Sequence, residues 1–466
     1  MTLSRRELLR RAAVLGSAVW AGRFLGGCVP PPPPATGYGP LRPVSDQEGR
    51  AVLALPEGFA YVTFGHIGRP MPGGGAFPHR PDGMAAFPGS DGTVRLIRNH
   101  EIPGGSASPG AVGGPAAARY DPAAGGGCVT LDYDPARGSL VRAFVSLNGT
   151  ILNCNGGSSL GGGAWISGEE SVVGPTGSTL PHGYCFSVPV DATGATLGAP
   201  LAAMGRFQHE AVAAHPVSGV VFETEDGYAD NATPLDRRSG FYRFLPTDPG
   251  RLESGGGLEM LAVAGSPGYD ARTGQRVGAA LPVTWVPIGD PAPNPISNAN
   301  RPFAQGLAGG GAVFSRLEGV WWSNGWVFFV STDGGNAGFG QVWRYRFDTQ
   351  QLVLHYEAPA GGSALESPDG GVASPRDGLL LCEDDAVGNA DTHPAAPGIS
   401  NVNRLIGIGA DGTPFEFAVN RLNKSEFAGT CFSPDGNTLF VNVYGTGALD
   451  SGMTCAITGP WSNGPL

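Results

Sequence analysis

Short apolar runs recur along the chain, each preceded by a turn that contains glycine and followed by acidic or polar residues. The clearest units are HPVSGVVFETED (215–226), SNGWVFFVSTDG (323–334), SPRDGLLLCEDD (374–385) and SPDGNTLFVNVYG (433–445). Their turn glycines lie roughly 50 to 60 residues apart, or twice that distance, which is typical of propeller blades built from several short strands each. The pattern therefore predicts a repeating, strand-rich architecture.

The intervening segments fit the same architecture. Alternating apolar and polar runs around polar turns, as in 128–149 and 341–359, indicate antiparallel hairpins. We predict an all-β fold, a β-propeller with six blades, formed as a single domain by residues 46–466. A two-domain β-sandwich is the rival architecture, and the quasi-period argues against it. Residues 252–312 are rich in Gly, Ala and Pro, so we expect an insertion or long loops there, and little helix in the whole chain.

Composition agrees with this fold and limits the function. Gly 77 and Pro 42 in 466 residues, with only 15% charged residues, suit short strands and turns better than helices. The formal net charge of −11 lacks the basic footprint of a nucleic-acid-binding protein. An anionic substrate would therefore need local help from an arginine or a bound cation.

The N-terminus has the pattern of an export signal. Ser4 to Leu9 reads SRRELL, a twin-arginine pattern, and a weakly apolar stretch follows it. We assign residues 1–28 to a twin-arginine signal peptide and 29–45 to a Pro-rich linker. The segment LGGC ending at Cys28 resembles a lipobox, and a simple cleavage site nearby is the alternative. Export through the twin-arginine translocon to the periplasm or beyond is expected, with membrane contact only through a lipid on Cys28.

Carboxylates gather at the ends of the apolar runs. The acidic residues at these positions are Glu101, Glu169, Glu170, Glu223, Glu225, Asp226, Asp333, Glu383, Asp384 and Asp385. In a propeller the equivalent ends of successive units converge, and clustered carboxylates either take up protons or bind cations. Oxygen ligands suit Ca²⁺, whereas an added cysteine thiolate points to a transition metal. A solvated turn remains the alternative for each acid taken alone.

Ten short blocks occur in order along the chain, and they are RNHE (98–101), NCNGG (153–157), SGEE (167–170), GRFQHEA (205–211), RLEG (316–319), STDGG (331–335), GQVWRY (340–345), SPDG (367–370), LLLCED (379–384) and SEFAGTCFSPDGNTLFVN (425–442). Together they resemble one known family, the PhoX-type alkaline phosphatases, which are exported bacterial propeller enzymes. The resemblance covers about residues 50 to 445, and the order of the blocks makes it specific.

The resemblance implies a centre of two Fe³⁺ ions and Ca²⁺ at the mouth of the propeller channel, where phosphate monoesters are hydrolysed. It implies that Cys154 bridges the irons and that Arg316 grips the substrate phosphate. The implied catalytic residues are Cys154, Arg316, Glu318 and Glu169, and the implied substrate-binding residues are Arg316, Asn153 and Trp165. The implied metal ligands are Cys154, Glu169, Glu210, Glu318, Asp226, Asp369, Glu383 and Glu101.

The residue spacing supports part of this assignment independently. Arg316 lies two positions before Glu318, so on a strand both side chains share one face, and a guanidinium fork beside a metal carboxylate suits phosphate binding. The alternative for Arg316 and Glu318 is a surface ion pair in which the two charges neutralise each other. The alternative for Cys154 is a small buried side chain with a packing role alone. The span SSLGGGAW (158–165) departs from the family's proline-tryptophan loop and keeps only Trp165.

We therefore expect an exported metal-dependent phosphatase that acts as a monomer on a small phosphorylated substrate. The alternatives are a hydrolase of another ester class, such as a phosphotriester or a lactone, and a non-catalytic, calcium-stabilised binding propeller. Metal content and a substrate panel discriminate among these functions.

Overall fold

The computed structural model describes residues 37–227, 238–359, 365–384, 403–409 and 412–466. The chain divides into two units, Met1–Thr36 and Gly37–Leu466, and all described residues belong to the second unit. The predicted export signal, with Cys28, lies outside the described residues. No helix among the described residues has the length and apolarity needed to cross a membrane.

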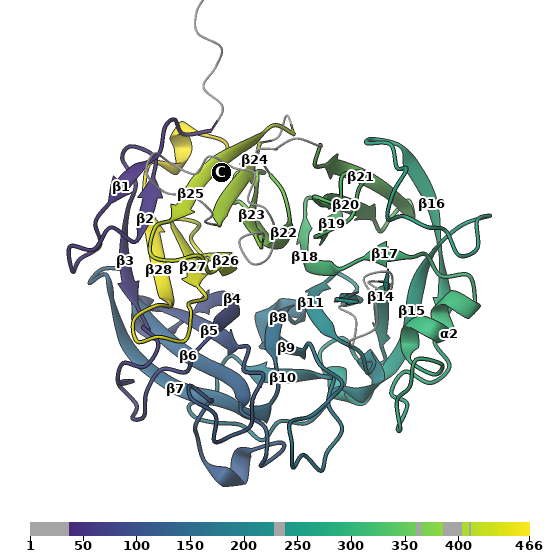
Figure 1. Cartoon of the computed structure of the whole chain (residues 1–466), viewed down its shortest axis with the longest axis horizontal. Helices are drawn as coiled ribbons and strands as arrows, with labels where there is room; N and C mark the ends of the chain where they lie inside the picture. The colour runs from purple at the N-terminus through teal and green to yellow at the C-terminus, as the bar shows by residue number, and fades with distance from the viewer. Residues whose placement is uncertain (1–36, 228–237, 360–364, 385–402, 410–411) are drawn as a thin grey trace, which may run out of the picture. The chain divides into compact units, whose positions relative to one another are not determined.

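Antiparallel sheets arranged around a central opening make up the Gly37–Leu466 unit (Figure 1). One sheet consists of β4 (Pro81–Pro88), β5 (Val94–His100), β6 (Gly126–Asp134) and β7 (Ser139–Thr150), and the next of β8 (Asn153–Ser158), β9 (Ala164–Glu169) and β10 (Cys185–Pro189). A nine-stranded sheet has the order β11 (His209–Ala214), β12 (Val221–Glu225), β14 (Phe241–Pro246), β15 (Gly256–Val263), β16 (Ala280–Pro287), β21 (Gln351–Glu357), β20 (Gln341–Arg346), β19 (Trp326–Ser331), β18 (Leu317–Ser323). A small sheet pairs β13 (Arg238–Ser239) with β17 (Phe314–Ser315).

Two more sheets complete the arrangement. A six-stranded sheet has the order β1 (Arg42–Val44), β2 (Leu53–Leu55), β25 (Pro414–Asn420), β24 (Arg404–Ile408), β23 (Leu379–Glu383), β22 (Pro368–Ala373). The last contains β26 (Phe427–Phe432), β27 (Thr438–Val443), β28 (Met453–Thr458) and β3 (Ala60–Phe64). Because β3 pairs with β28, the beginning and the end of the described chain share one sheet, which closes the ring without a free edge at that point.

The predicted all-β propeller is confirmed by this arrangement. The six-blade count stays a prediction, because the nine-stranded sheet runs through two of the expected blades without a break. Helix is scarce, as expected: the described helices are α2 (Pro302–Ala308) and the 3-10 turns η1 (Ser90–Gly92), η2 (Ala116–Ala118), η3 (Leu160–Gly162), η4 (Ala202–Met204), η6 (Leu252–Ser254) and η7 (Trp461–Asn463).

Two segments differ from the sequence-based prediction. The expected insertion at 252–312 contains β15, β16 and α2, and β16 joins the two halves of the nine-stranded sheet. The predicted linker is too long, since residues 37–45 belong to the folded unit. The Tyr38 ring packs against Phe59 and Phe417, and its hydroxyl donates to the carbonyl of Leu466 at 2.9 Å.

Residue alternation explains why these segments form strands. In β20 the side chains of Trp343 and Tyr345 are buried in the core, whereas those of Arg344 and Arg346 lie on the opposite, half-buried face. The guanidinium groups of both arginines lie over the Trp326 ring and form cation–π contacts with it. Successive side chains of a strand point to opposite faces of the sheet, so this alternation of buried and half-buried residues favours a strand.

Candidate active site

Six innermost strands of the described chain start with the same backbone arrangement. Each innermost strand pairs with the strand that follows it in the sequence. The N–H of the residue directly after that second strand donates to the carbonyl oxygen of the residue directly before the innermost strand. The donor and acceptor pairs are Glu101 and Arg80, Glu170 and Leu152, Asp226 and Gln208, Thr332 and Arg316, Asp384 and Ser367, and Tyr444 and Glu426. A repeated hydrogen bond of this kind holds six strand starts around one opening.

A β-bulge follows this hydrogen bond in each innermost strand. The shifts in register fall between Pro81 and Met84, Asn153 and Gly156, His209 and Val212, Leu317 and Val320, Pro368 and Gly371, and Ala428 and Cys431. A bulge re-aims side chains out of the regular alternation. Here it directs the second residue of five of these strands inward, and these residues are Asp82, Cys154, Glu210, Glu318 and Asp369.

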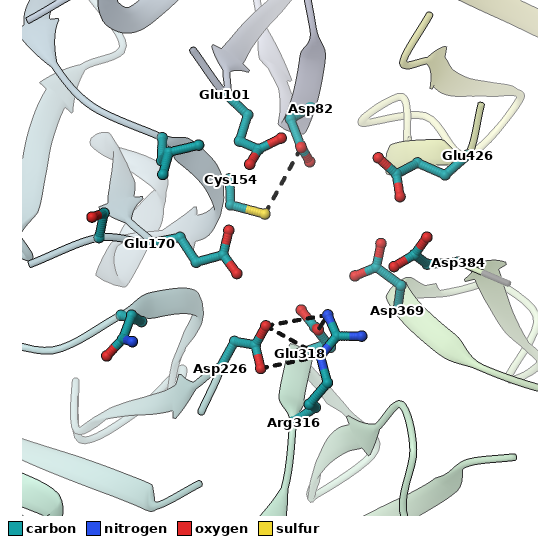
Figure 2. Close-up of a pocket in the computed structure, with 13 residues that line it drawn as sticks. Asp82, Glu101, Cys154, Glu170, Asp226, Arg316, Glu318, Asp369, Asp384 and Glu426 are labelled. Carbon is teal, nitrogen blue, oxygen red and sulfur yellow. Dashed lines mark hydrogen bonds and ion pairs between the residues drawn. The ribbon is translucent and has the colours of Figure 1, made fainter. Parts of the chain in front are cut away.

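The strand starts enclose an acidic cavity of about 380 Å³. Its described lining comprises Asp82, Glu101, Leu152, Cys154, Glu170, Ser171, Gln208, Asp226, Arg316, Glu318, Asp369, Asp384 and Glu426. Figure 2 shows the carboxylates and the Cys154 sulfur converging from different sheets on the same space. These lining residues include eight carboxylates and one guanidinium, so negative charge exceeds positive charge among them.

Glu210 lies at the junction of two potential metal-ligand groups. Ligand atoms of Cys154, Glu170 and Glu210 lie within 4.8 Å of one another, and so do those of Glu210, Glu318 and Asp369. Both carboxylate oxygens of Glu210 are buried and make no hydrogen bond to the described residues. Buried oxygens without donors are costly unless a cation or a proton compensates them.

Burial and mutual repulsion both make these carboxylates retain protons. Burial is the largest cause of the raised pKa values, and neighbouring carboxylates add to it in every case. The carboxyl groups with raised pKa values are Asp82, Glu101, Glu170, Glu210, Glu318, Asp369 and Glu426. Burial likewise raises the pKa of the Cys154 thiol, which donates to Asp82 Oδ2 at 3.8 Å. Cations bound among these groups would remove the protons and take over the compensating charge.

Arg316 is the guanidinium of the cavity, and two carboxylates orient it. Its Nη2 donates to Glu318 Oε1 at 2.7 Å and to Asp226 Oδ2 at 3.2 Å. Burial would lower the pKa of Arg316, but Asp226 and Glu318 outweigh this effect and raise it. The residue itself has φ of 40°, so the start of β18 adopts a left-handed conformation that side chains rarely take. This strained start places the guanidinium beside the acids (Figure 2).

The donor types fit a mixed set of cations. The group with Cys154 combines one sulfur with carboxylate oxygens, which suits a transition metal, whereas the group of Glu210, Glu318 and Asp369 offers oxygen alone, which suits Ca²⁺. The unpartnered oxygens of Glu210 belong to both groups. The site therefore has the composition of a metal centre with an anion-binding arginine at its edge.

Comparison with known proteins shows the family to which this chain belongs. The model of the family described as alkaline phosphatase PhoX matches residues 36–133 and 122–447. The chain belongs to this family. PhoX proteins are metal-dependent phosphoric ester hydrolases, so the acidic cavity is the place to look for this activity.

A solved structure of a PhoX protein shares this fold. The structure of Pseudomonas fluorescens PhoX in complex with vanadate, a transition state analogue, covers 91% of this chain and 98% of its own, at 17% identity and a TM-score of 0.65. A gluconolactonase from Xanthomonas campestris covers 91% of this chain and 99% of its own, at 10% identity and a TM-score of 0.43. The comparison with curated proteins yields no match.

Six of the predicted site residues line the PhoX cavity, and a seventh completes its candidate ligand groups. These residues are Cys154, Arg316, Glu318, Asp226, Asp369 and Glu101, and Glu210 completes both candidate metal-ligand groups beside them. Glu101 accepts a hydrogen bond from the Tyr444 hydroxyl and lies 3.8 Å from Arg80 Nη1. These side chains come together as predicted, and their roles remain predictions.

Glu169 and Glu383 do not face the cavity, and their placement corrects the prediction. Glu169 accepts hydrogen bonds from the N–H groups of Ile151 and Gly183 and contacts His182 Nδ1 at 2.7 Å. Glu383 forms a buried bidentate ion pair with Arg404, with both distances 2.7 Å. Each is the last residue of its strand and is completely buried. The next residue in each case, Glu170 or Asp384, turns into the cavity.

Asn153 and Trp165 also lie away from the cavity. Asn153 is buried, accepts from the Thr150 hydroxyl at 2.6 Å and donates to Ser167 Oγ at 2.9 Å. Trp165 Nε1 donates to Asn99 Oδ1 at 2.8 Å, and its ring packs in an apolar cluster. Both side chains hold β8 and β9 in place, so neither can contact substrate in the cavity.

Asp82 and Glu426 line the cavity but are not among the site residues predicted from the sequence. Asp82 lies in RPDG (80–83), which has the same form as RLEG (316–319) and SPDG (367–370), two of the blocks that resemble the PhoX family. Alignment of the three blocks would have identified Asp82. Glu426 has no such signal, because it precedes its strand, whereas the aligned second position is the apolar Ala428.

Proposed function

We propose that this protein is an exported phosphatase that hydrolyses phosphate monoesters at a mixed iron and calcium centre in the acidic cavity. The observation that carries the proposal is the sharing of Glu210 between a sulfur-containing group and an all-oxygen group. Cys154, Glu170 and Glu210 would hold the two Fe³⁺ ions, with the Cys154 thiolate among the ligands. Glu210, Glu318 and Asp369 would hold Ca²⁺.

Further carboxylates around the opening offer ligands for additional Ca²⁺. Glu101 and Asp82 lie at the top of the view and Glu426 and Asp384 at the right, and all four line the cavity (Figure 2). Asp226 is engaged by Arg316, so its part is to orient the guanidinium. When bound, the cations supply positive charge that neutralises the phosphate oxygens and Lewis acidity that activates the attacking water.

The protein's own residues bind and orient the ester. The Arg316 fork matches two phosphate oxygens, and the paired carboxylates of Asp226 and Glu318 fix its plane before substrate arrives. An incoming phosphate competes with these carboxylates for the guanidinium. Neutralisation of Glu318 by a cation therefore weakens its hold on Arg316 and favours the phosphate, which couples metal loading to substrate affinity.

Export and assembly belong to the same proposal. The twin-arginine pattern at residues 4–9 marks the protein for a translocon that carries folded chains, so the metals can be loaded before export. Cys28 is the candidate lipid-bearing residue. We propose a periplasmic or extracellular monomer whose partner is a small phosphorylated substrate.

The test is metal analysis combined with turnover. Protein matured through the twin-arginine route should contain iron and calcium, show iron–thiolate absorption and hydrolyse p-nitrophenyl phosphate. A calcium chelator should abolish turnover, and added Ca²⁺ should restore it, whereas Mg²⁺ serves as the control that should not. A panel with a phosphotriester and a lactone tests the ester class.

Two results would contradict the proposal. Fully metallated protein without turnover on several phosphate monoesters would remove the assigned reaction. Calcium without iron in protein from a competent host would favour a non-catalytic, calcium-stabilised propeller.

A further inference from the structure

A second cluster of metal-binding side chains lies outside the acidic cavity. Cys185 begins β10, His209 begins β11 and Glu223 lies in β12, and all three side chains are completely buried. Ligand atoms of the three lie within 4.8 Å of one another. None of them lines the cavity. His209 and Glu210 are neighbours on β11, yet only Glu210 joins the cavity's ligand groups.

The hydrogen bonds of His209 leave one ring nitrogen available. Its Nε2 lies 3.2 Å from the carbonyl oxygen of Gly205, which requires Nε2 to carry a proton and donate. Nδ1 of the neutral ring then presents a lone pair, and it has no hydrogen-bond partner among the described residues. A carbonyl on the far nitrogen is the usual partner of a metal-bound histidine, because it fixes the tautomer and the ring orientation.

Glu223 faces this lone pair with another acceptor. Its Oε2 lies 3.3 Å from His209 Nδ1, and both of its carboxylate oxygens are buried without a hydrogen-bond donor in the described part of the chain. Two acceptors face each other here, so the contact needs a proton or a cation between them. Burial raises the pKa values of Glu223 and Cys185, which marks the cost of ionising them without compensation.

We propose that Cys185, His209 and Glu223 form a structural site for a zinc-type divalent cation, separate from the acidic cavity. Sulfur, imidazole nitrogen and carboxylate oxygen are the ligands that Zn²⁺ takes in proteins. A thiolate and a carboxylate balance the two charges of the ion, so the buried site is neutral when filled. The separation of Nδ1 and Oε2 suits two ligands of one tetrahedral ion.

The site would link two neighbouring sheets. Cys185 belongs to the three-stranded sheet of β8, β9 and β10, whereas His209 and Glu223 belong to the nine-stranded sheet. An ion bound by all three therefore bridges the sheets that carry Cys154 and Glu210. Its removal should loosen this contact and lower the free energy of unfolding.

Cobalt substitution tests the site without relying on activity. The Cys154→Ser variant, which lacks the cavity thiolate, is stripped of metal and titrated with Co²⁺. We expect thiolate-to-Co²⁺ charge-transfer absorption that saturates at about one equivalent. Cys154→Ser/Cys185→Ser should lose this absorption. Cys154→Ser/Cys455→Ser, in which another buried cysteine is changed, should retain it.

A conservative change keeps the test valid if the double variants fold poorly. In Cys154→Ser/Glu223→Gln the amide can donate to His209 Nδ1 and preserve the local packing. Co²⁺ should nevertheless bind at least about tenfold more weakly. Zn²⁺ is expected to raise the Tm of Cys154→Ser and should not raise the Tm of this double variant. Absence of the charge-transfer band with Cys185 intact would overturn the site. The same band in Cys154→Ser/Cys185→Ser would do so too.

Discussion

Two cavities of almost equal size lie along the same innermost strands, and they differ in chemistry. The acidic cavity measures about 380 Å³ and is built from the strand starts and the residues that follow neighbouring strands. The second cavity, about 390 Å³, is lined by later residues of the same strands, such as Met84–Ala86, Val212–Ala214 and Val320–Trp322. No carboxylate is among the described residues that line the second cavity.

The β-bulges mark the boundary between the two chemistries. Within the bulges, side chains such as Glu210 and Glu318 converge on one space and create unbalanced negative charge. After it, glycines, alanines and tryptophans return to the regular alternation and hold the strands together. The backbone is therefore the frame for both cavities, and the cation-binding chemistry comes from a few residues at one end of each strand.

The largest expected difference between the two cavities concerns the cysteine in each of them. Cys154 lies in the acidic cavity and Cys431 in the second cavity, both on innermost strands. Cys154→Ala should lower kcat/KM for p-nitrophenyl phosphate by at least about 1000-fold, some 4 kcal/mol, because the thiolate ligand is lost. Metal analysis of the same variant should show reduced iron.

Cys431→Ala is the matched control. The side chain is a buried thiol in an apolar cluster, so its truncation should cost only about 1 kcal/mol of stability and leave turnover intact. Equal loss of activity in both variants would mean that the first effect is structural and that the acidic cavity holds no thiolate-bound metal.

Adjacent glutamates at the end of β9 sharpen the comparison further. Glu170→Gln should lower activity by about 100-fold, or 2.7 kcal/mol, and reduce bound metal, because a charged ligand becomes a neutral amide. Glu169→Gln should instead cost about 1 to 3 kcal/mol of stability, since its carboxylate accepts from three backbone N–H groups and contacts His182. Its metal content per folded molecule should stay unchanged. Metal analysis and thermal unfolding of both variants separate the two effects. The reverse result, with metal lost only from Glu169→Gln, would restore the original sequence-based assignment.

The pair also shows where sequence reasoning succeeds and where it stops. The repeat spacing predicted the propeller, and acidic strand ends predicted a cation-binding opening. The choice between Glu169 and Glu170, or between Glu383 and Asp384, depends on which residue ends the strand. Regular alternation gives no answer there, because the ladder stops at Glu169 and Glu383 and bulges disturb the facing strands. Only the backbone shows that the last residue of the strand is buried away from the cavity and that the next residue lines the cavity.

Arg316 tests whether the acidic cavity receives an anion. Arg316→Lys keeps the charge but loses the planar fork, so KM should rise by about 10- to 50-fold with a smaller change in kcat. Arg346→Lys, at an arginine that lies over the Trp326 ring, is the control and should leave KM unchanged. A KM that stays the same in Arg316→Lys would mean that the guanidinium serves only to neutralise Asp226 and Glu318.

The smallest expected effect is the pH dependence of the metal-free protein. Cavity carboxyls such as Asp369 have pKa values raised on folding, here from 3.8 to about 8. A raised pKa means that the folded state binds more protons, so stability from this source is full below about pH 4 and is lost as the pH rises toward 8. Chelated protein should therefore unfold more easily at pH 8 than at pH 5, by at least about 1 kcal/mol, the free energy of one pKa unit. Added Ca²⁺ should reverse the difference, because the cation replaces the protons. Denaturant unfolding at both pH values measures it, and a metal-free protein that is equally stable at both would show that the carboxylates do not repel one another as their placement requires.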